Sequence, residues 1–205
     1  MPKDTFFNLP EEKRERIIEA AIDEFAKHTY HKASINRIVE KSDIAKGSFY
    51  QYFEDKKDLF KYIIKLSSEK KLQYLMHVIG NMEDMNFFQI VRELYIAGLK
   101  FAKDNPKLAT IGQNFMKDTD TKLKEEILGE NMPKSDNFFE QILRREIEKG
   151  EIVKDLDVKV IAHMITSLSI SIGEYFYLEN GIADDDKIMS LVDTMIYVLE
   201  NGIKK

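Results

Sequence analysis

The sequence predicts an all-α fold in two parts, an N-terminal three-helix helix-turn-helix domain followed by a C-terminal helical domain. Apolar residues recur at helical spacing along most of the 205 residues, and no stretch alternates convincingly in the way of a strand. Hydrophobic residues make up 43% of the chain and charged residues 33%, which is typical of a folded globular protein. Between residues 34 and 60, two short helical patterns flank a tight turn.

The first helix is expected to begin near residue 8 and to support the core. Asn8 is a suitable N-cap, Glu11 completes a capping box, and Pro10 is tolerated in the first turn. The connector that follows contains His28 and His31, but no cysteine or carboxylate partner lies nearby in sequence, so no metal site is expected. The apolar stripe of this first helix consists of Ile17, Ile18, Ala21, Ile22, Phe25 and Ala26.

The helix-turn-helix is predicted from local chemistry between residues 34 and 53. Ser34 can cap the first short helix through its hydroxyl, and residues 35–39 place three apolar side chains on one face. Ser42 and Asp43 break the helix because they favour side-chain bonds to nearby backbone. A second helix then begins at Lys46, and it is too short to be stable without packing. Its inner face carries Phe49 and Phe53.

The outward residues of the second helix suit contact with a DNA major groove. Lysine supplies charge, glycine allows close approach of backbone, and the other side chains supply hydrogen bonds. Asn36, early in the first short helix, carries an amide that matches adenine. A solvated turn between two core helices is the alternative, but it leaves the outward tyrosine and glutamine unexplained. The outward residues are Lys46, Gly47, Ser48, Tyr50 and Gln51.

The segment resembles the tetracycline-repressor (TetR) family of bacterial regulators over roughly residues 10–65. The resemblance is carried by a Ser/Thr cap, a hydrophobic pair, a small turn, the run 46–53 (Lys-Gly-Ser-Phe-Tyr-Gln-Tyr-Phe), then Lys56 and the pair Leu59–Phe60. It implies a dimeric regulator that responds to a ligand, most commonly a repressor, with Ser34 and Lys56 holding phosphates. Asp43 departs from the glycine usual in the family, so this turn is expected either to be less tight or to be closed by the aspartate side chain.

The charge distribution favours a DNA-binding tip on an acidic body. Residues 27–57 contain seven basic and four acidic residues, a balance of +3, which leaves −8 for the rest of a chain whose net charge is −5. The absence of cysteine excludes disulfides and thiol chemistry and is consistent with a cytoplasmic protein. The most apolar stretch, residues 160–178, contains His163 and Glu174, so no membrane segment is expected.

Beyond residue 86 the patterns predict further helices. Helices are expected over about 86–105, 108–116, 138–150, 157–178 and 187–201, with a polar loop and some helix over 118–133. Ser169 and Gly173 form a small-residue strip on the longest of these helices, and the final helix has a wide apolar face. The resemblance implies that the last two long helices form a two-fold, four-helix interface between two copies. Burial within one subunit accounts for part of these faces, or for all of them.

A small-molecule effector pocket in the body is the second functional expectation. Aromatic and methionine side chains can line a flexible apolar pocket, although core packing is the more common role for any one of them. Glu174 lies in the most apolar helix, where burial would require a partner such as Arg144, Arg145 or a cationic ligand; an exposed position is equally open. The candidate pocket residues are Tyr95, Phe101, Phe115, Met116, Phe139, Met164, Glu174 and Tyr175.

No catalytic constellation is present in the sequence. It lacks a glycine-rich phosphate loop, a Gly-x-Ser-x-Gly motif and cysteine, and its four histidines have no paired motif. We therefore expect no enzyme, no cofactor and no metal. The favoured interpretation assigns residues 1–56 to DNA binding and 57–205 to effector binding and dimerisation, with an operator duplex, a second copy and an unknown small molecule as partners. The alternative is a helical ligand-binding or protein-interaction module that does not bind DNA.

Overall fold

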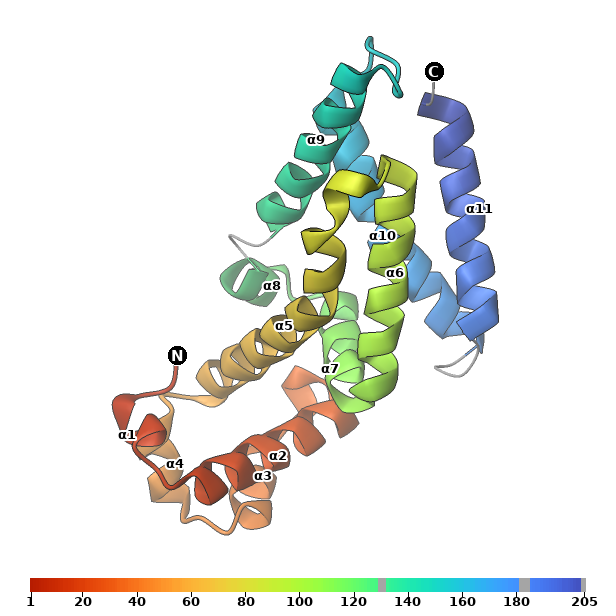
Figure 1. Ribbon diagram of the computed structural model, residues 1–205. Coiled ribbons are helices and arrows are strands. Elements are labelled where there is room, and N and C mark those ends of the chain that lie inside the picture. Colours follow the sequence, from red (N-terminus) through yellow and green to blue (C-terminus); the bar gives the residue numbers. More distant parts are fainter. Residues whose placement is uncertain (129–131, 181–184, 204–205) are drawn as a thin grey trace. The chain divides into compact units, whose positions relative to one another are not determined.

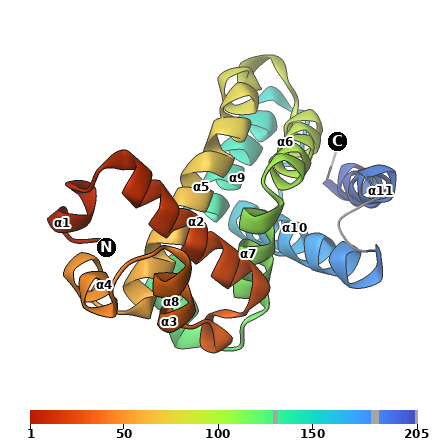
Figure 2. The ribbon, with the colours of Figure 1, turned by 90° about the horizontal axis from the view of Figure 1, so that it is seen from below.

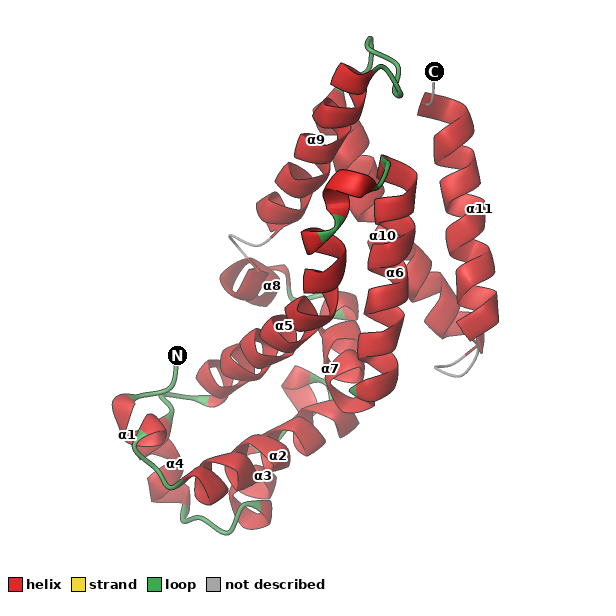
Figure 3. Ribbon diagram, viewed as in Figure 1, coloured by secondary structure: helices red, strands yellow, loops and turns green. Residues whose placement is uncertain are grey.

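The computed structural model describes residues 1–128, 132–180 and 185–203, and within these ranges the chain contains helices and no β-strand (Figure 1, Figure 3). The predicted all-α fold is therefore confirmed. The α-helices are α1 (Asp4–Phe7), α2 (Glu11–Lys27), α3 (Ile35–Lys41), α4 (Lys46–Tyr52), α5 (Lys56–Gly80), α6 (Phe87–Asp104), α7 (Pro106–Lys117), α8 (Thr121–Leu128), α9 (Met132–Lys149), α10 (Val158–Asn180) and α11 (Asp185–Ile203); two 3-10 turns are η1 (Tyr30–Lys32) and η2 (Met82–Asp84).

The chain folds into two compact units. The first consists of residues 1–72 and 104–127, and the second of residues 73–103 and 128–205. Helix α5 is continuous and contributes its first part to one unit and its last part to the other. The first unit thus contains helices from both predicted functional ranges, 1–56 and 57–205, and the assignment of functions to those ranges stays a prediction.

The first unit is built around tightly packed aromatic and aliphatic side chains. Phe49 and Phe53 are fully buried, as predicted for the inner face of the second helix of the motif. The ring of Phe60 lies 4.8 Å from that of Phe25 on α2 and 5.6 Å from that of Phe115 on α7, measured between centroids. These contacts make α7 part of the same core as the helix-turn-helix.

The start of the chain differs from the expectation. Asn8 does not cap α2, whose N-cap is Pro10 with no side-chain hydrogen bond, so the expected capping box with Glu11 does not form. The reason is a short helix, α1, that the sequence patterns did not predict: Asn8 is its C-cap, and the Asn8 amide donates to the carbonyl of Asp4 at 3.0 Å. Asn8 therefore ends one helix instead of beginning the next.

The turn between α3 and α4 is closed by backbone hydrogen bonds and not by the side chain of Asp43. The amide of Ile44 donates to the carbonyl of Val39 at 3.0 Å and that of Asp43 to Glu40 at 3.3 Å, which together form a Schellman motif. Asp43 adopts a φ of 51°, the left-handed conformation in which glycine is most common. The turn is thus as tight as a glycine would make it, because aspartate tolerates this region better than most residues. Ser42 is buried, and its hydroxyl donates to the carbonyl of Ile38 at 2.7 Å, as the break in the pattern predicted.

The second unit has its own apolar core, supported by well-capped helices. Asn86 and Gln89 cap α6 reciprocally through their side chains and amides, and Asp157 accepts amide hydrogen bonds at the start of α10. Gly150, with a φ of 83°, ends α9 as expected. The polar stretch after residue 118 contains α8, which lies in the first unit except for its last residue and whose Leu123 is buried. The buried residues of this core include Phe87, Ile90, Val91, Leu143, Ile152, Ala162 and Ile165, which are almost fully inaccessible, and Met195 and Leu199.

The last two helices bury only part of their apolar surface within the chain. Val192, Met195 and Leu199 of α11 are buried, and the last two belong to the core of the second unit. On α10, by contrast, Val160, Met164 and Leu168 recur every four residues and are 52%, 47% and 37% exposed. Two further exposed apolar residues, Tyr197 and Val198, lie on α11. Among the described residues, no helix is long and apolar enough to cross a membrane.

Candidate nucleic-acid interface

One surface hollow brings together five of the eight residues predicted to contact DNA. Its volume is about 270 Å³, and residues from the start of α3, from α4 and from the start of α5 line it. The residues predicted but not in its lining are Gly47, Ser48 and Gln51, which lie on α4; Gly47 and Gln51 are exposed and Ser48 is half-buried. The lining consists of Ser34, Asn36, Lys46, Tyr50 and Lys56, together with Ala33 and Ile35.

Helix α4 presents opposite faces to the core and to the surface. Phe49, Tyr52 and Phe53 are buried, whereas Tyr50 and Gln51 are exposed, Tyr50 by 45%. A Cβ atom added at Gly47 would meet no atom within 4 Å, so packing inside the chain does not require glycine there. Glycine in a helix costs about 1 kcal/mol relative to alanine. Since packing within the chain gives no reason for a glycine here, its presence is consistent with close approach of an external molecule to the backbone at this position.

A buried carboxylate holds the start of α3 in place. Glu24, on α2, is 7% exposed, and it accepts hydrogen bonds from the Ser34 amide at 2.7 Å and from the Arg37 guanidinium through both of its oxygens. Burial raises the pKa of Glu24, but the hydrogen bonds from Arg37 and Ser34 outweigh it and hold the pKa below its ordinary value. Sequence reasoning missed this residue, since a glutamate in a charged helix is usually exposed.

Ser34 is the N-cap of α3, as predicted, but not through its hydroxyl. The Ser34 hydroxyl accepts no hydrogen bond from the amides of the first turn of α3. Instead, the carboxylate of Glu24 lies at the start of the helix and accepts a hydrogen bond from the Ser34 amide. A negative charge is favourable at the positive end of a helix dipole, and here it comes from another helix. The predicted hydroxyl cap was therefore wrong, although the predicted helix boundary was correct.

Lys56 organises the connector before α3. Its ammonium donates to the carbonyl of Ala33 at 3.0 Å and lies 4.6 Å from the centre of the Tyr30 ring. Burial lowers the pKa of Lys56, with the charge of Glu24 acting in the opposite direction. The contacts with Ala33 and Tyr30 therefore fix the Lys56 side chain where it lines the hollow. Its contact with a DNA phosphate stays a prediction.

Acidic residues of the first unit pair with lysines that do not line the hollow. Asp23 accepts hydrogen bonds from Lys107 and Lys41, which lower its pKa, and Glu126 accepts one from Lys57 at 2.7 Å, which lowers its pKa. By contrast, the structure shows no ion pair between Lys46 and another described residue. Lys41, Lys57 and Lys107 are thus paired with carboxylates, whereas Lys46, in the lining of the hollow, is not.

The connector histidine has carboxylate neighbours that are distant in sequence. Nε2 of His31 lies 3.3 Å from Asp118 and 3.7 Å from Asp120, both in the segment between α7 and α8. Sequence spacing could not reveal this neighbourhood, since the partners are almost ninety positions apart. Within the described part of the chain, no group of three or more His, Cys, Asp or Glu side chains is arranged to hold a metal ion.

The predicted effector residues are distributed over both units. Phe115 and Met116 lie on α7 in the first unit, whereas Tyr95, Phe101, Phe139 and Met164 lie in the second. Burial raises the pKa of Tyr95, whose hydroxyl approaches the Met195 sulfur at 3.8 Å, while Met164 is largely exposed. The side chains of Glu174 and Tyr175 lie outside the described part of the structure. The effector pocket accordingly stays a prediction.

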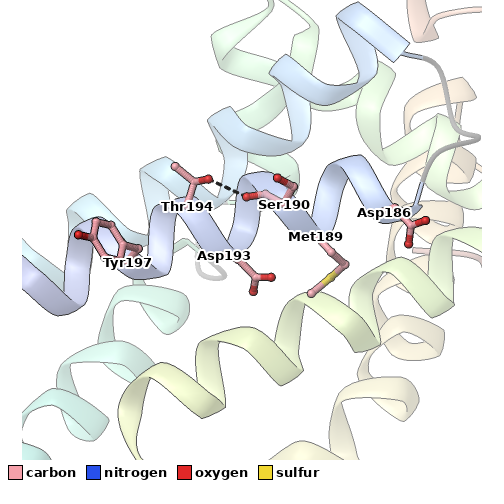
Figure 4. Close-up of a pocket in the computed structure, with 6 residues that line it drawn as sticks. All are labelled: Asp186, Met189, Ser190, Asp193, Thr194 and Tyr197. Atoms are coloured by element: carbon pink, nitrogen blue, oxygen red, sulfur yellow. Dashed lines mark hydrogen bonds between the residues drawn. The ribbon is translucent and has the colours of Figure 1, made fainter.

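A second hollow, of about 460 Å³, lies on the surface along α11 (Figure 4). None of the predicted effector residues line it, and all of its lining residues come from this one helix. Asp193, one of them, is paired with Arg92 of α6 at 2.9 Å. The lining consists of Asp186, Met189, Ser190, Asp193, Thr194 and Tyr197.

Comparisons with known proteins agree over nearly the whole chain. The family model of bacterial regulatory proteins of the tetR family matches residues 17–63, and that of the tetracyclin repressor-like C-terminal domain matches residues 85–204. The fatty acid metabolism regulator protein of Bacillus subtilis (strain 168) is 27% identical over 191 residues, covering 92% of this chain and 94% of that protein.

Solved structures show the same likeness. A TetR family transcriptional regulator from Chloroflexus aurantiacus J-10-FL is 31% identical and covers 100% of this chain and 99% of its own, with a TM-score of 0.73. The regulator FadR from Bacillus subtilis in complex with stearoyl-CoA has the same fold, with a TM-score of 0.73, 23% identity and coverage of 92% of this chain and 98% of its own.

We expect Glu24→Gln to lower the free energy of unfolding at pH 7 by about 1–3 kcal/mol, because a buried charged hydrogen-bond acceptor is replaced by a neutral one. Since the pKa of Glu24 is lowered in the folded state, its stabilisation is present above the ordinary carboxyl pKa and is lost as pH falls through the lowered value. Urea unfolding followed by circular dichroism should therefore show a smaller difference between the two proteins at about pH 3 than at pH 7.

The matched control is Glu12→Gln on the same helix. The Glu12 side chain is 92% exposed and lies 4.0 Å from Arg16, so its loss should hardly change stability at either pH. An equal effect of Glu24→Gln at both pH values would contradict the assigned role of the carboxylate.

Proposed function

Because the chain belongs to the TetR family of bacterial regulatory proteins, and is thus a transcriptional regulator and not an enzyme, we propose that it acts as a dimeric repressor that a small molecule releases from a palindromic operator. Residues 1–56 would read the DNA, and residues 57–205 would bind the effector and hold the dimer together. The hollow lined by Ser34, Asn36, Lys46, Tyr50 and Lys56 is the observation that carries the DNA-binding part of this proposal.

The hollow has the chemistry that a DNA duplex requires. Its lining offers two ammonium groups for phosphates, an amide that matches adenine, and a tyrosine that can contact either a phosphate or a base edge. Gly47, Ser48 and Gln51 extend this surface along α4, and the glycine leaves room for the duplex to approach closely. In a two-fold dimer, two such surfaces would read half-sites about 34–36 Å apart, or a multiple of that distance.

We expect Lys46→Ala and Tyr50→Ala each to weaken operator binding at least about 30-fold, because each substitution removes an interaction of about 1–3 kcal/mol from both protomers. The probe is a fluorescent duplex bearing the site that the wild-type protein selects from a randomised DNA pool, titrated by anisotropy at several salt concentrations. Lys46→Ala should also reduce the slope of log affinity against log salt by about 2, since each protomer would neutralise one phosphate fewer.

Lys70→Ala is the matched control for the charge change. This lysine is exposed on α5, 14 residues beyond Lys56, which is about 21 Å along a helix. Wild-type affinity for both hollow variants would exclude this surface as the reading surface. Failure of the wild-type protein to enrich any sequence would favour the module without DNA binding.

We further propose that the dimer forms through α10 and α11. Val160, Met164 and Leu168 make an exposed apolar stripe on α10, and an isologous contact between two copies would remove it from water. A buried glutamate in such a contact would be unpaired and costly. Met164→Glu and Leu168→Glu should therefore give monomers in sedimentation velocity at micromolar concentration. Lys159→Glu, at a neighbouring polar position, is the control and should remain dimeric; dimers in all three variants would place the interface elsewhere.

An acyl-CoA is the first effector to test. The proposal is supported by the likeness to a regulator of fatty acid metabolism over 92% of this chain, and by the acyl-CoA bound to a structural neighbour. Stearoyl-CoA at micromolar concentration should lower the affinity of the protein for the selected duplex, because a ligand that prefers the released arrangement shifts the population towards it. Coenzyme A without the acyl chain is the control. No effect of stearoyl-CoA on operator affinity or melting temperature would exclude this effector class.

A further inference from the structure

The last carbonyl groups of α4 accept hydrogen bonds from the start of the chain. A helix leaves its final four carbonyls without helical partners, and in α4 these belong to residues 49–52. The carbonyl of Phe49 accepts the amide of Phe53, the residue after the helix, at 2.9 Å. The other three accept from residues 3 and 5: the Lys3 ammonium donates to Tyr50 at 2.9 Å, the Thr5 hydroxyl to Gln51, and the Lys3 amide to Tyr52 at 2.9 Å.

The donors are held in place by a buried aromatic side chain. Phe6, within α1, is fully buried, and its ring lies 4.8 Å from that of Phe53 and 5.5 Å from that of Tyr62. Figure 1 and Figure 2 both show α1 beside α4. The anchor fixes the direction of the neighbouring side chains, so Thr5 and Lys3 reach the end of α4 as part of a packed element.

The two carbonyls that receive side-chain donors belong to Tyr50 and Gln51, which are predicted to contact DNA. Lys3 and Thr5 do not line the hollow, and residues 1–16 precede the part of the chain that matches the N-terminal family model. Their effect on DNA would therefore pass through the backbone of α4. Lys3 also places a positive charge at the negative end of the helix dipole.

We propose that the segment 3–7 is a positioning element of the DNA-reading surface, acting as an external C-terminal cap for α4. This inference rests on the proposed DNA-binding function of that helix. A seven-residue helix is marginal without outside contacts, and its last turn carries the side chains that must match a groove. Loss of the cap allows that turn to fray, and DNA binding must then restore its order at a cost in affinity.

Thr5→Val tests the cap without changing charge or shape, because valine keeps the branched form of threonine and lacks only the donor. Thr5→Ser keeps the donor and is the rescue control. We expect Thr5→Val to speed hydrogen exchange of the amides of residues 50–53 in the DNA-free protein at least about threefold, since local opening becomes easier. With Lys3→Met added, affinity for the selected duplex should fall about three- to tenfold, and Thr5→Ser should bind like the wild type.

Salt dependence separates positioning from direct contact. If the cap alone acts, Thr5→Val weakens binding with an unchanged slope of log affinity against log salt. A slope reduced by about 2 in Lys3→Met, together with wild-type behaviour of Thr5→Val, would mean that Lys3 contacts phosphates directly and would overturn the proposal.

Two further results would overturn it. One is unchanged exchange of residues 50–53 in Thr5→Val, and the other is faster exchange with no loss of operator affinity in the double variant. If the wild-type protein selects no DNA sequence, the proposed function fails, while the exchange measurement still decides whether residues 3 and 5 cap α4.

Discussion

The proposed DNA-reading surface depends on a helix, α4, that is too short to be stable without contacts from outside it. Seven residues form fewer than two turns, so the nucleation cost of α4 must be met by contacts from outside it. Phe49 and Phe53 supply these on the inner face, and the Schellman turn at Asp43 fixes the direction from which the chain enters. At the C-terminal end of α4, hydrogen bonds from Lys3 and Thr5 reach carbonyl groups that have no partner within the helix. The contacts that position α4 therefore do not involve its outward side chains, which leaves these side chains available for the proposed contacts with DNA.

The same unit arranges its charges so that the hollow keeps a positive character. Carboxylates from α2 and α8 are paired with lysines outside it, as Asp23 is with Lys41 and Glu126 with Lys57. Within the hollow, the Lys56 ammonium donates to neutral carbonyl groups and forms no ion pair with a described carboxylate. Exposed pairs of this kind add little to stability. Their main consequence is electrostatic, because an acidic chain can approach a polyanion only where its positive charges are not neutralised.

Local features of the fold could be predicted from the sequence, and long-range ones could not. Residues 34–60 carry their own helix breakers and apolar spacing, so α3, the turn and α4 followed from neighbours in sequence, although the Ser34 hydroxyl cap did not. The structural role of Glu24 could not be predicted, because it depends on hydrogen bonds from Arg37 and from the Ser34 amide, which come close to Glu24 only in the folded chain. The cap expected at Asn8 failed for a related reason: four residues are too few to show periodicity, and Phe6 is helical because it packs on Phe53.

The proposed effector response involves the covalent connections between the two units. Three points of the chain join the units, near residues 72, 103 and 127, and the first lies within the continuous helix α5. That helix carries Lys56 at one end and the core residue Val78 near the other. The segment 104–127 belongs to the same unit as the helix-turn-helix and is tied to it by Lys107 and Glu126. If an effector acts by moving α5 or this segment, the movement would displace Lys56 or the ion pairs of Asp23 with Lys107 and of Glu126 with Lys57.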